Sequence, residues 1–371
     1  MKEKRLKLSD RAAVLLALGL LLAAGLFALL WPHGDFSDAE RRYLATAPSA
    51  PSLSAWKTDK ETESWLSDRI PFRSVLVGVD SCAEVLTGRR TLLETWPVAG
   101  AFLEQPVEGS AKTAERRLQQ FGRLAESLDA SWQVIVPRSH GWLLRGRMNG
   151  LLRMQYETEN EIYKALEADE HFLDVLPEGT DPEAVYYRTD HHWNLEGAYR
   201  AYEAACRSNG LPVLSPDDFE RSSFTGFYGT TRSRSGLPAL RGDTLECADP
   251  AGTVTMTVLD DGTVYDHLIF PEQAETYDGY AVYLNGNHGL LEITNPDAPG
   301  GTLLVYKDSF ANCLLPLLAA DYSRIVAVDA RYYAGSFSEA AAAAGKVDKV
   351  LFVYSPDSLV NDTSVAGKAG R

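Results

Sequence analysis

Residues 302–354 read TLLVYKDSFANCLLPLLAADYSRIVAVDARYYAGSFSEAAAAAGKVDKVLFVY, and this stretch decides the fold. Three short apolar runs have the length and composition of buried strands, at 302–306, 324–328 and 350–354. The segments between them, 310–319 and 337–344, are expected to be helical, with a kink at Pro316. Strands that alternate with helices in this way predict a parallel sheet covered by helices.

Further elements are expected upstream of this stretch. The helices are expected at 58–90 in two pieces broken around Pro71, at 110–128 with Ser110 as N-cap, at 149–169, and from the N-cap Asn194 to Gly210. Strands are expected at 132–136, 172–176 and 185–187. The Gly-, Ser- and Thr-rich segment 217–285, with β-like runs at 254–259 and 263–270, is interpreted as an insertion. We predict an α/β fold, a three-layer α/β/α sandwich with a β-rich insertion.

The amino-terminal segment is typical of a membrane anchor. Residues 1–11 carry five basic and two acidic side chains, and residues 12–31 contain no charged side chain. A helix of that length spans roughly 30 Å, the thickness of a bilayer core. Trp31 and Pro32 close it, and the basic flank places the amino terminus in the cytoplasm. We expect an uncleaved single-pass anchor in the cell membrane; a cleaved signal peptide and a buried core helix are the alternatives.

Composition and element order set the expected organisation. The parts are a cytoplasmic basic tail (1–11), a transmembrane anchor (12–31), a Pro-, Ala- and Ser-rich linker (32–56), a helical lead-in (57–109), an α/β domain outside the membrane (110–360) and a tail (361–371). The net charge of −15 argues against a nucleic-acid binder. The four cysteines form no CxxC pair, which argues against a zinc ribbon or a disulfide scaffold.

Ser309 is the sharpest candidate for chemistry. It follows the run 302–306 and precedes the helix expected at 310–319, and open α/β sheets place their sites at the carboxyl ends of strands. A serine there directs its hydroxyl into the crevice, where helix amides stabilise an oxyanion. The alternative is a serine that only caps the helix.

The second candidate is Asp190-His191-His192-Trp193. In an extended stretch Asp190 and His192 share one face, and His191 faces away. A carboxylate beside a histidine fixes the imidazole tautomer and stabilises the imidazolium, as a general base requires. A structural hydrogen-bonded pair and a metal site are the alternatives, but the other histidines show no metal-ligand spacing, so no metal is expected.

These four residues resemble the namesake motif of the DHHW family of bacterial exported proteins. The similarity continues through the segments SDRIPFR (67–73), GFYG (226–229), NGNH (285–288), KDSF (307–310) and DARYY (329–333), and covers about residues 35–360. The family is similar to the AlgX and AlgJ alginate O-acetylation proteins, which have an SGNH-hydrolase-like fold. In them an Asp-x-His-Trp motif precedes a Gly-Asp-Ser-Phe motif that holds the nucleophile.

The resemblance implies that Asp190, His192 and Ser309 are the acid, the base and the nucleophile. Lys307 departs from the pattern, because those relatives have glycine there. Asn287 is similar to the SGNH asparagine that donates to the oxyanion, with a plain Asn-Gly turn as the alternative.

Three further residues are weaker candidates for contacts with a substrate. Arg331 is a candidate for binding a hydroxyl or carboxylate, with a structural salt bridge as the alternative. Trp193 is a candidate for stacking on a sugar, with core packing as the alternative. Tyr228 lies in a glycine-rich loop that is a candidate rim of the site.

The resulting hypothesis is acyl transfer through Ser309, His192 and Asp190 to a sugar hydroxyl or to water, without a cofactor. The expected acceptor is a cell-envelope or secreted polysaccharide. The resemblance implies a multi-spanning membrane acyltransferase as the source of acetyl groups. A non-catalytic carbohydrate-binding scaffold on the same fold and a metal-dependent hydrolase are the alternatives.

Overall fold

The computed structural model describes residues 8–32, 34–37, 40, 42–48, 58–89, 91–92, 94–238 and 241–369. The basic tail up to residue 7 and the linker residues 49–56 lie outside the described residues. The chain divides into two compact units, residues 1–89 and 90–371.

The amino-terminal unit is largely helical. Its elements are α1 (Leu8–Leu30), β1 (Phe36–Ser37), β2 (Arg42–Tyr43), α3 (Thr58–Asp68) and α4 (Arg73–Leu86). The predicted break around Pro71 is confirmed, because it separates α3 from α4. Within α1, Ala12–Leu30 is unburied and has a mean hydropathy of 2.7. This helix is long and apolar enough to serve as a membrane anchor or as a signal segment.

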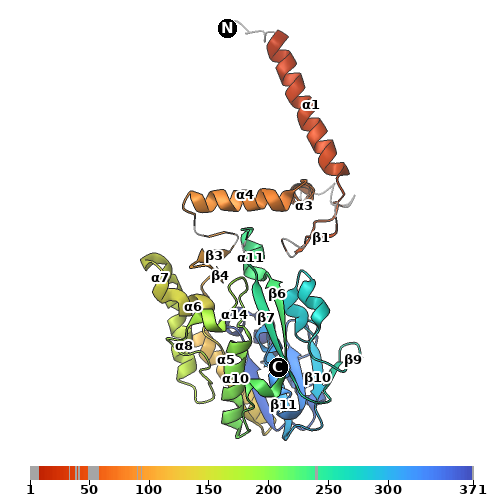
Figure 1. Ribbon diagram of the computed structural model, residues 1–371. Helices are drawn as coiled ribbons and strands as arrows, with labels where there is room; N and C mark the ends of the chain where they lie inside the picture. The colour runs from red at the N-terminus through yellow and green to blue at the C-terminus, as the bar shows by residue number, and fades with distance from the viewer. Residues whose placement is uncertain are drawn as a thin grey trace. The chain divides into compact units, whose positions relative to one another are not determined.

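The carboxy-terminal unit is built on one mixed sheet (Figure 1). In spatial order its strands are β5 (Ser131–Ile135), β13 (Lys349–Val353), β11 (Gly300–Lys307), β12 (Tyr322–Asp329), β10 (Leu290–Thr294), β8 (Thr255–Val258) and β9 (Thr263–Tyr265). The first four are parallel to one another, as the alternating pattern predicts. The last three strands pair antiparallel. The unit is therefore a mixed α/β fold.

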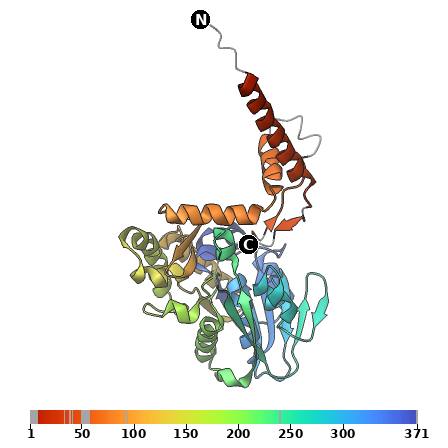
Figure 2. The ribbon, with the colours of Figure 1, turned by 45° about the horizontal axis from the view of Figure 1, so that its top comes forward.

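Both faces of the sheet are buried, which explains why its central strands are continuous apolar runs. In β11, Leu303 and Val305 belong to one core cluster, whereas Leu304 and Tyr306 belong to the other. The first cluster is covered by α10 (Leu195–Asn209) and the hairpin of β6 (Phe219–Phe227) and β7 (Asp243–Pro250), which lie in front of the sheet in Figures 1 and 2. The second is covered by α5 (Ala111–Ser127), α8 (Asn160–Glu167) and α13 (Phe337–Ala344).

Shorter elements complete this unit. They are the hairpin of β3 (Thr95–Val98) and β4 (Ala101–Glu104), the helices α6 (His140–Leu144), α7 (Gly150–Tyr156), α9 (Pro182–Val185), α11 (Thr230–Ser235), α12 (Leu315–Leu318), α14 (Pro356–Asn361) and α15 (Thr363–Lys368), and several 3-10 turns. Residues 57–109, expected to be helical, thus also contain a β-hairpin.

Capping residues set the helix ends where the sequence predicts them. The Ser110 side chain accepts a hydrogen bond from the Thr113 amide at the start of α5. The Asn194 side chain accepts one from the Gly197 amide at the start of α10, and Gly210 ends that helix in a left-handed conformation.

Four expected elements differ in the structure. The expected helix 310–319 is two short pieces, η6 (Ser309–Asn312) and α12, with Pro316 in the first turn of α12. The expected strand 185–187 does not form, because Val185 ends α9, which Asp181 caps, and Tyr186 makes only an isolated bridge to Trp193. The run 172–176 contributes only a bridge from Phe172 to Val134. The segment 217–285 is not a separate insertion, since β8 and β9 extend the central sheet.

We expect alanine substitutions at two helical glycines to change the free energy of unfolding in opposite directions. At Gly197 in α10 a Cβ would lie 2.7 Å from the Val185 carbonyl oxygen and 2.8 Å from the Trp193 Cβ, so we expect Gly197→Ala to cost about 1–3 kcal/mol. At Gly122 in α5 the nearest atom, on Trp132, is an ordinary 3.4 Å away. We therefore expect Gly122→Ala to stabilise by about 0.5–1 kcal/mol. Denaturant unfolding measures both, and stabilisation by Gly197→Ala would contradict the packing of α10.

Candidate active site

Ser309 lies at the carboxyl end of a central parallel strand. β11 ends at Lys307, and η6 starts two residues later. The Asp308 carboxylate accepts hydrogen bonds from the Phe310 amide at 2.9 Å and from the Ser355 amide at 2.7 Å. Asp308 is therefore the N-cap of η6, and the Ser309 hydroxyl is left for another partner.

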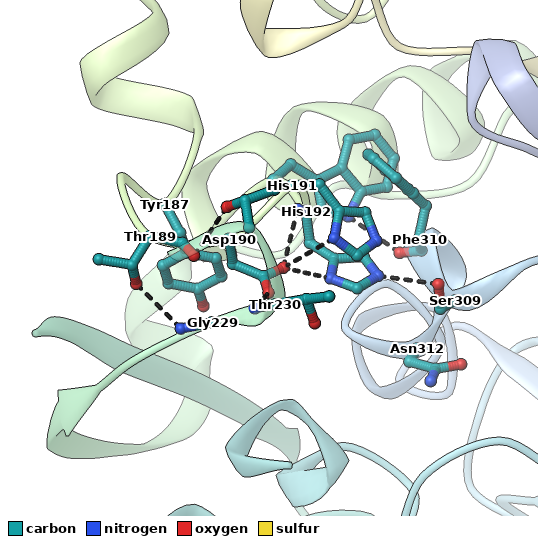
Figure 3. A network of polar contacts seen from close by, with 12 residues as sticks. Tyr187, Thr189, Asp190, His191, His192, Gly229, Thr230, Ser309, Phe310 and Asn312 are labelled. Carbon is teal, nitrogen blue, oxygen red and sulfur yellow. Dashed lines mark hydrogen bonds and ion pairs between the residues drawn. The ribbon is translucent and has the colours of Figure 1, made fainter. Parts of the chain in front are cut away.

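That partner is His192. Its Nε2 lies 2.8 Å from Ser309 Oγ, and its Nδ1 lies 2.5 Å from Asp190 Oδ1 (Figure 3). An ionised carboxylate only accepts hydrogen bonds, so it holds the proton of neutral His192 on Nδ1. Nε2 then carries the lone pair and accepts the hydrogen bond from the Ser309 hydroxyl. The three residues form the hydrogen-bonded order of a nucleophile, a general base and an orienting acid.

The contact between Asp190 and His192 has a different local origin from the predicted one. These residues lie in a bend rather than in a strand, and Asp190 Oδ1 also accepts the His192 backbone amide at 3.0 Å. This is an Asx-turn, in which an aspartate grips the backbone two residues on. His191 does not face away, because its ring centroid lies 3.9 Å from that of His192. The expectation of an extended stretch is therefore wrong.

A neighbouring loop holds the other side of the acid. Asp190 Oδ2 accepts the Thr230 amide at 2.7 Å (Figure 3). The backbone of Gly229 passes so close that a Cβ there would overlap the Asp190 side chain. The segment GFYG, singled out in the sequence, thus leads into the loop that clamps Asp190.

Asp190, His192 and Ser309 are buried, but His192 and Ser309 keep some access to solvent. Asp190 is 0% exposed, His192 5% and Ser309 9%. Burial lowers the pKa of His192 from 6.5 to about 4, His191 acts in the same direction, and Asp190 opposes both. Tyr280 stacks on the imidazole with ring centroids 3.8 Å apart and an interplanar angle of 4°. The His192 imidazole is therefore held in place and is uncharged at neutral pH.

The weaker candidates occupy three different environments. Trp193 is fully buried, and its Nε1 donates to the Phe310 carbonyl at 2.9 Å, so it packs beneath the site. Arg331 forms a bidentate pair with Asp329, at 2.9 and 2.6 Å. Tyr228 is half-exposed, with the Arg232 guanidinium 5.1 Å from its ring centroid.

Asn287 is linked to the site by Asn312, a residue that the sequence analysis does not single out. Asn312 Nδ2 donates to Asn287 Oδ1 at 3.0 Å, and Asn312 Oδ1 accepts from Lys307 Nζ at 2.7 Å. Asn312 lies three residues after Ser309, which places both on one turn of η6. That spacing is the only sequence signal for it, because a helical pattern treats 310–319 as a single buried helix.

A metal would compete with bonds that already exist. Among the described residues, ligand atoms of Asp190, His191 and His192 lie within 4.8 Å of one another. Both ring nitrogens of His192 and both Asp190 oxygens, however, are engaged in the hydrogen bonds above. A metal bound there would have to displace the contact between His192 and Ser309 or that between His192 and Asp190.

A cavity adjoins the site on the side of His191 and Phe310. It is lined by aromatic and polar side chains, among them Phe102, Glu104, Gln105, His140, Tyr156 and Asp357.

The fold and the site define an α/β protein with a Ser-His-Asp arrangement at the end of a parallel strand. The model of the DHHW protein family matches residues 170–328, which contain all three residues, so the resemblance to that family is confirmed. No curated protein sequence matches the chain.

Two solved structures share the fold, and a third is also similar to the chain. A DHHW family protein from Eubacterium siraeum has a TM-score of 0.62 and 20% identity, with 74% of this chain and 94% of that chain covered. PatB1 of Bacillus cereus with a sulfonyl adduct has a TM-score of 0.59 and 23% identity, with 73% and 96% covered. The O-acetyltransferase domain of Pseudomonas putida AlgJ is more distant, with a TM-score of 0.40, 14% identity and coverage of 73% and 96%.

Because His192 is buried, we expect it to become protonated only at a lower pH than an exposed histidine. Because its folded pKa of about 4 lies below the usual 6.5, the unfolded chain binds a proton first as the pH falls. The contribution to stability is complete above pH 6.5 and is lost progressively between about pH 6.5 and 4, up to about 3 kcal/mol. Nitrogen NMR of the imidazoles should find His192 neutral at pH 5.5. A midpoint between pH 6 and 7 would contradict the assignment.

Proposed function

We propose that this chain is a serine-dependent O-acyltransferase or esterase. The observation that carries the proposal is the hydrogen-bonded series from Asp190 through His192 to Ser309, placed where a central strand ends. The capping role that would explain Ser309 without chemistry belongs to Asp308. The neutral state of His192 supports its role as the base.

Each proton has a place in the proposed reaction. Ser309 Oγ attacks the carbonyl carbon of an acyl ester, and its proton passes to His192 Nε2. Asp190 stabilises the resulting imidazolium. When the tetrahedral intermediate collapses, the bond to the leaving alkoxide breaks, and His192 returns the proton to that oxygen. A sugar hydroxyl or water then repeats the sequence on the acyl-serine and frees the enzyme.

The substrate class and the location follow from the family resemblance and the anchor. The similarity to alginate O-acetylation proteins favours acetyl as the acyl group and a cell-envelope or secreted polysaccharide as the acceptor. We infer that α1 anchors the chain in the cell membrane, with the α/β unit outside. A multi-spanning membrane acyltransferase would then supply the acetyl groups.

The proposed architecture is an SGNH-hydrolase-like three-layer sandwich. Its support is the pair of buried clusters, one on each face of the central sheet, with helices in both. The likeness to PatB1, whose structure was determined with a sulfonyl adduct, supports covalent chemistry on this fold.

The test uses the full chain in detergent, incubated with an aryl acetate and a panel of glycans. We expect intact-mass spectrometry to detect one added acetyl group on wild type, and none on Ser309→Ala. Ser323→Ala is the matched control, because within the described part of the chain its hydroxyl hydrogen-bonds the Gly301 carbonyl, at the far end of β11. It should be acetylated like wild type.

The acceptor panel separates transfer from hydrolysis. Acetyl groups recovered on a glycan support a transferase, and release as acetate alone supports an esterase. A different outcome would favour a carbohydrate-binding scaffold over an enzyme. In that outcome folded wild type never carries an acetyl group, and wild type and Ser309→Ala bind a glycan equally well.

A further inference from the structure

Lys307 is a lysine with almost no access to water. It is 1% exposed, and burial lowers the pKa of its ammonium from 10.5 to about 8. The nearest carboxylate oxygen, on Asp329, is 3.9 Å away, and Asp329 is already paired bidentately with Arg331. The closest partner of Lys307 Nζ is instead Asn312 Oδ1, at 2.7 Å. The main contact of this buried lysine is therefore a hydrogen bond to an amide.

This hydrogen bond fixes the direction of the Asn312 amide. A lysine ammonium donates and never accepts, so Asn312 must turn Oδ1 toward it and Nδ2 away from it. Nδ2 then donates to Asn287 Oδ1 at 3.0 Å and approaches the Gly286 carbonyl at 3.5 Å. This contact orients the Asn287 amide in turn. Its Oδ1 faces Asn312, and its Nδ2 is on the other side of the amide group.

Asn312, the member of this pair that contacts Lys307, lies close to the nucleophile. Ser309 and Asn312 are the first and last residues of η6, and residues three apart in a 3-10 helix stand on the same side. Figure 3 places Asn312 beside Ser309. The tetrahedral intermediate of acyl transfer places a negative oxygen near Ser309, which requires N–H donors and is repelled by carbonyl oxygens.

We propose that Lys307 is a positioning residue for acyl transfer: through Asn312 it orients Asn287 so that the amide N–H group of Asn287, rather than its carbonyl, serves the oxyanion formed at Ser309. This proposal rests on the acyl-transfer function proposed above. It gives a role to the residue that departs from the Gly-Asp-Ser-Phe pattern.

The experiment compares acylation kinetics of full-length variants with an aryl acetate. Lys307→Met keeps an unbranched side chain as far as Cε and removes the terminal ammonium donor. We expect the acylation rate constant to fall about 10²-fold with KM changed less than about threefold, because a transition-state donor is lost. Lys368→Met is the control, since among the described residues the hydrogen-bond partners of Lys368 Nζ are the Ala330 and Tyr333 carbonyls. Its rate constant should equal that of wild type.

A double-mutant cycle separates positioning from a general structural effect. Asn287→Asp replaces the proposed donor with an acceptor at the same size. If Lys307 acts through Asn287, the double variant Lys307→Met/Asn287→Asp is no slower than Asn287→Asp alone. Rate losses that multiply would overturn the proposal, as would a Lys307→Met variant as fast as wild type.

The remaining outcomes are also decisive. If Lys307→Met does not fold, Asn312→Asp tests the same link, because its carboxylate accepts from Lys307 and cannot donate to Asn287. The same loss of about 10²-fold is expected, and an unchanged rate overturns the proposal. A wild type that is never acylated at Ser309 overturns the proposed function and this inference together. An acylated wild type with fast variants overturns this inference alone.

Discussion

The hydrogen bond between His192 Nε2 and Ser309 Oγ is the contact on which the rest of the site depends. It joins residues 117 positions apart in the chain at 2.8 Å. On one side an Asx-turn at Asp190 sets the imidazole, and on the other the end of β11 and the Asp308 cap set the serine. Neither local structure brings the two side chains together alone, so the sheet and its covering elements must hold the two segments in place.

Burial sets the protonation state of the histidine in this contact. A histidine in water is partly protonated near neutral pH, whereas burial keeps His192 neutral with its lone pair on the serine. The same burial makes every unpaired polar group near it expensive. That is why the site carries a second polar network, in which Lys307 and two asparagine amides satisfy one another beside Ser309.

The parts of the fold that can be predicted from sequence are those fixed locally. β11, β12 and β13 are buried on both faces, so their apolar runs need no knowledge of tertiary contacts. The partnership of Asp190 with His192 is predictable, but its geometry is not, because an Asx-turn and a strand both bring residues two apart together. The role of Asn312 could not be predicted, because helical periodicity does not distinguish η6 from α12. The same periodicity also gives no reason to expect Lys307 to be buried beside them.

The most direct measurement is the rate at which a sulfonyl fluoride modifies the full-length protein, with the adduct located by peptide mapping. If His192 activates Ser309 as we describe, wild type carries a single adduct on Ser309. The His192→Gln variant should then react at least about 10³-fold more slowly. An adduct on another residue, or equal rates in the two proteins, would contradict the central claim that this buried hydrogen bond creates the nucleophile.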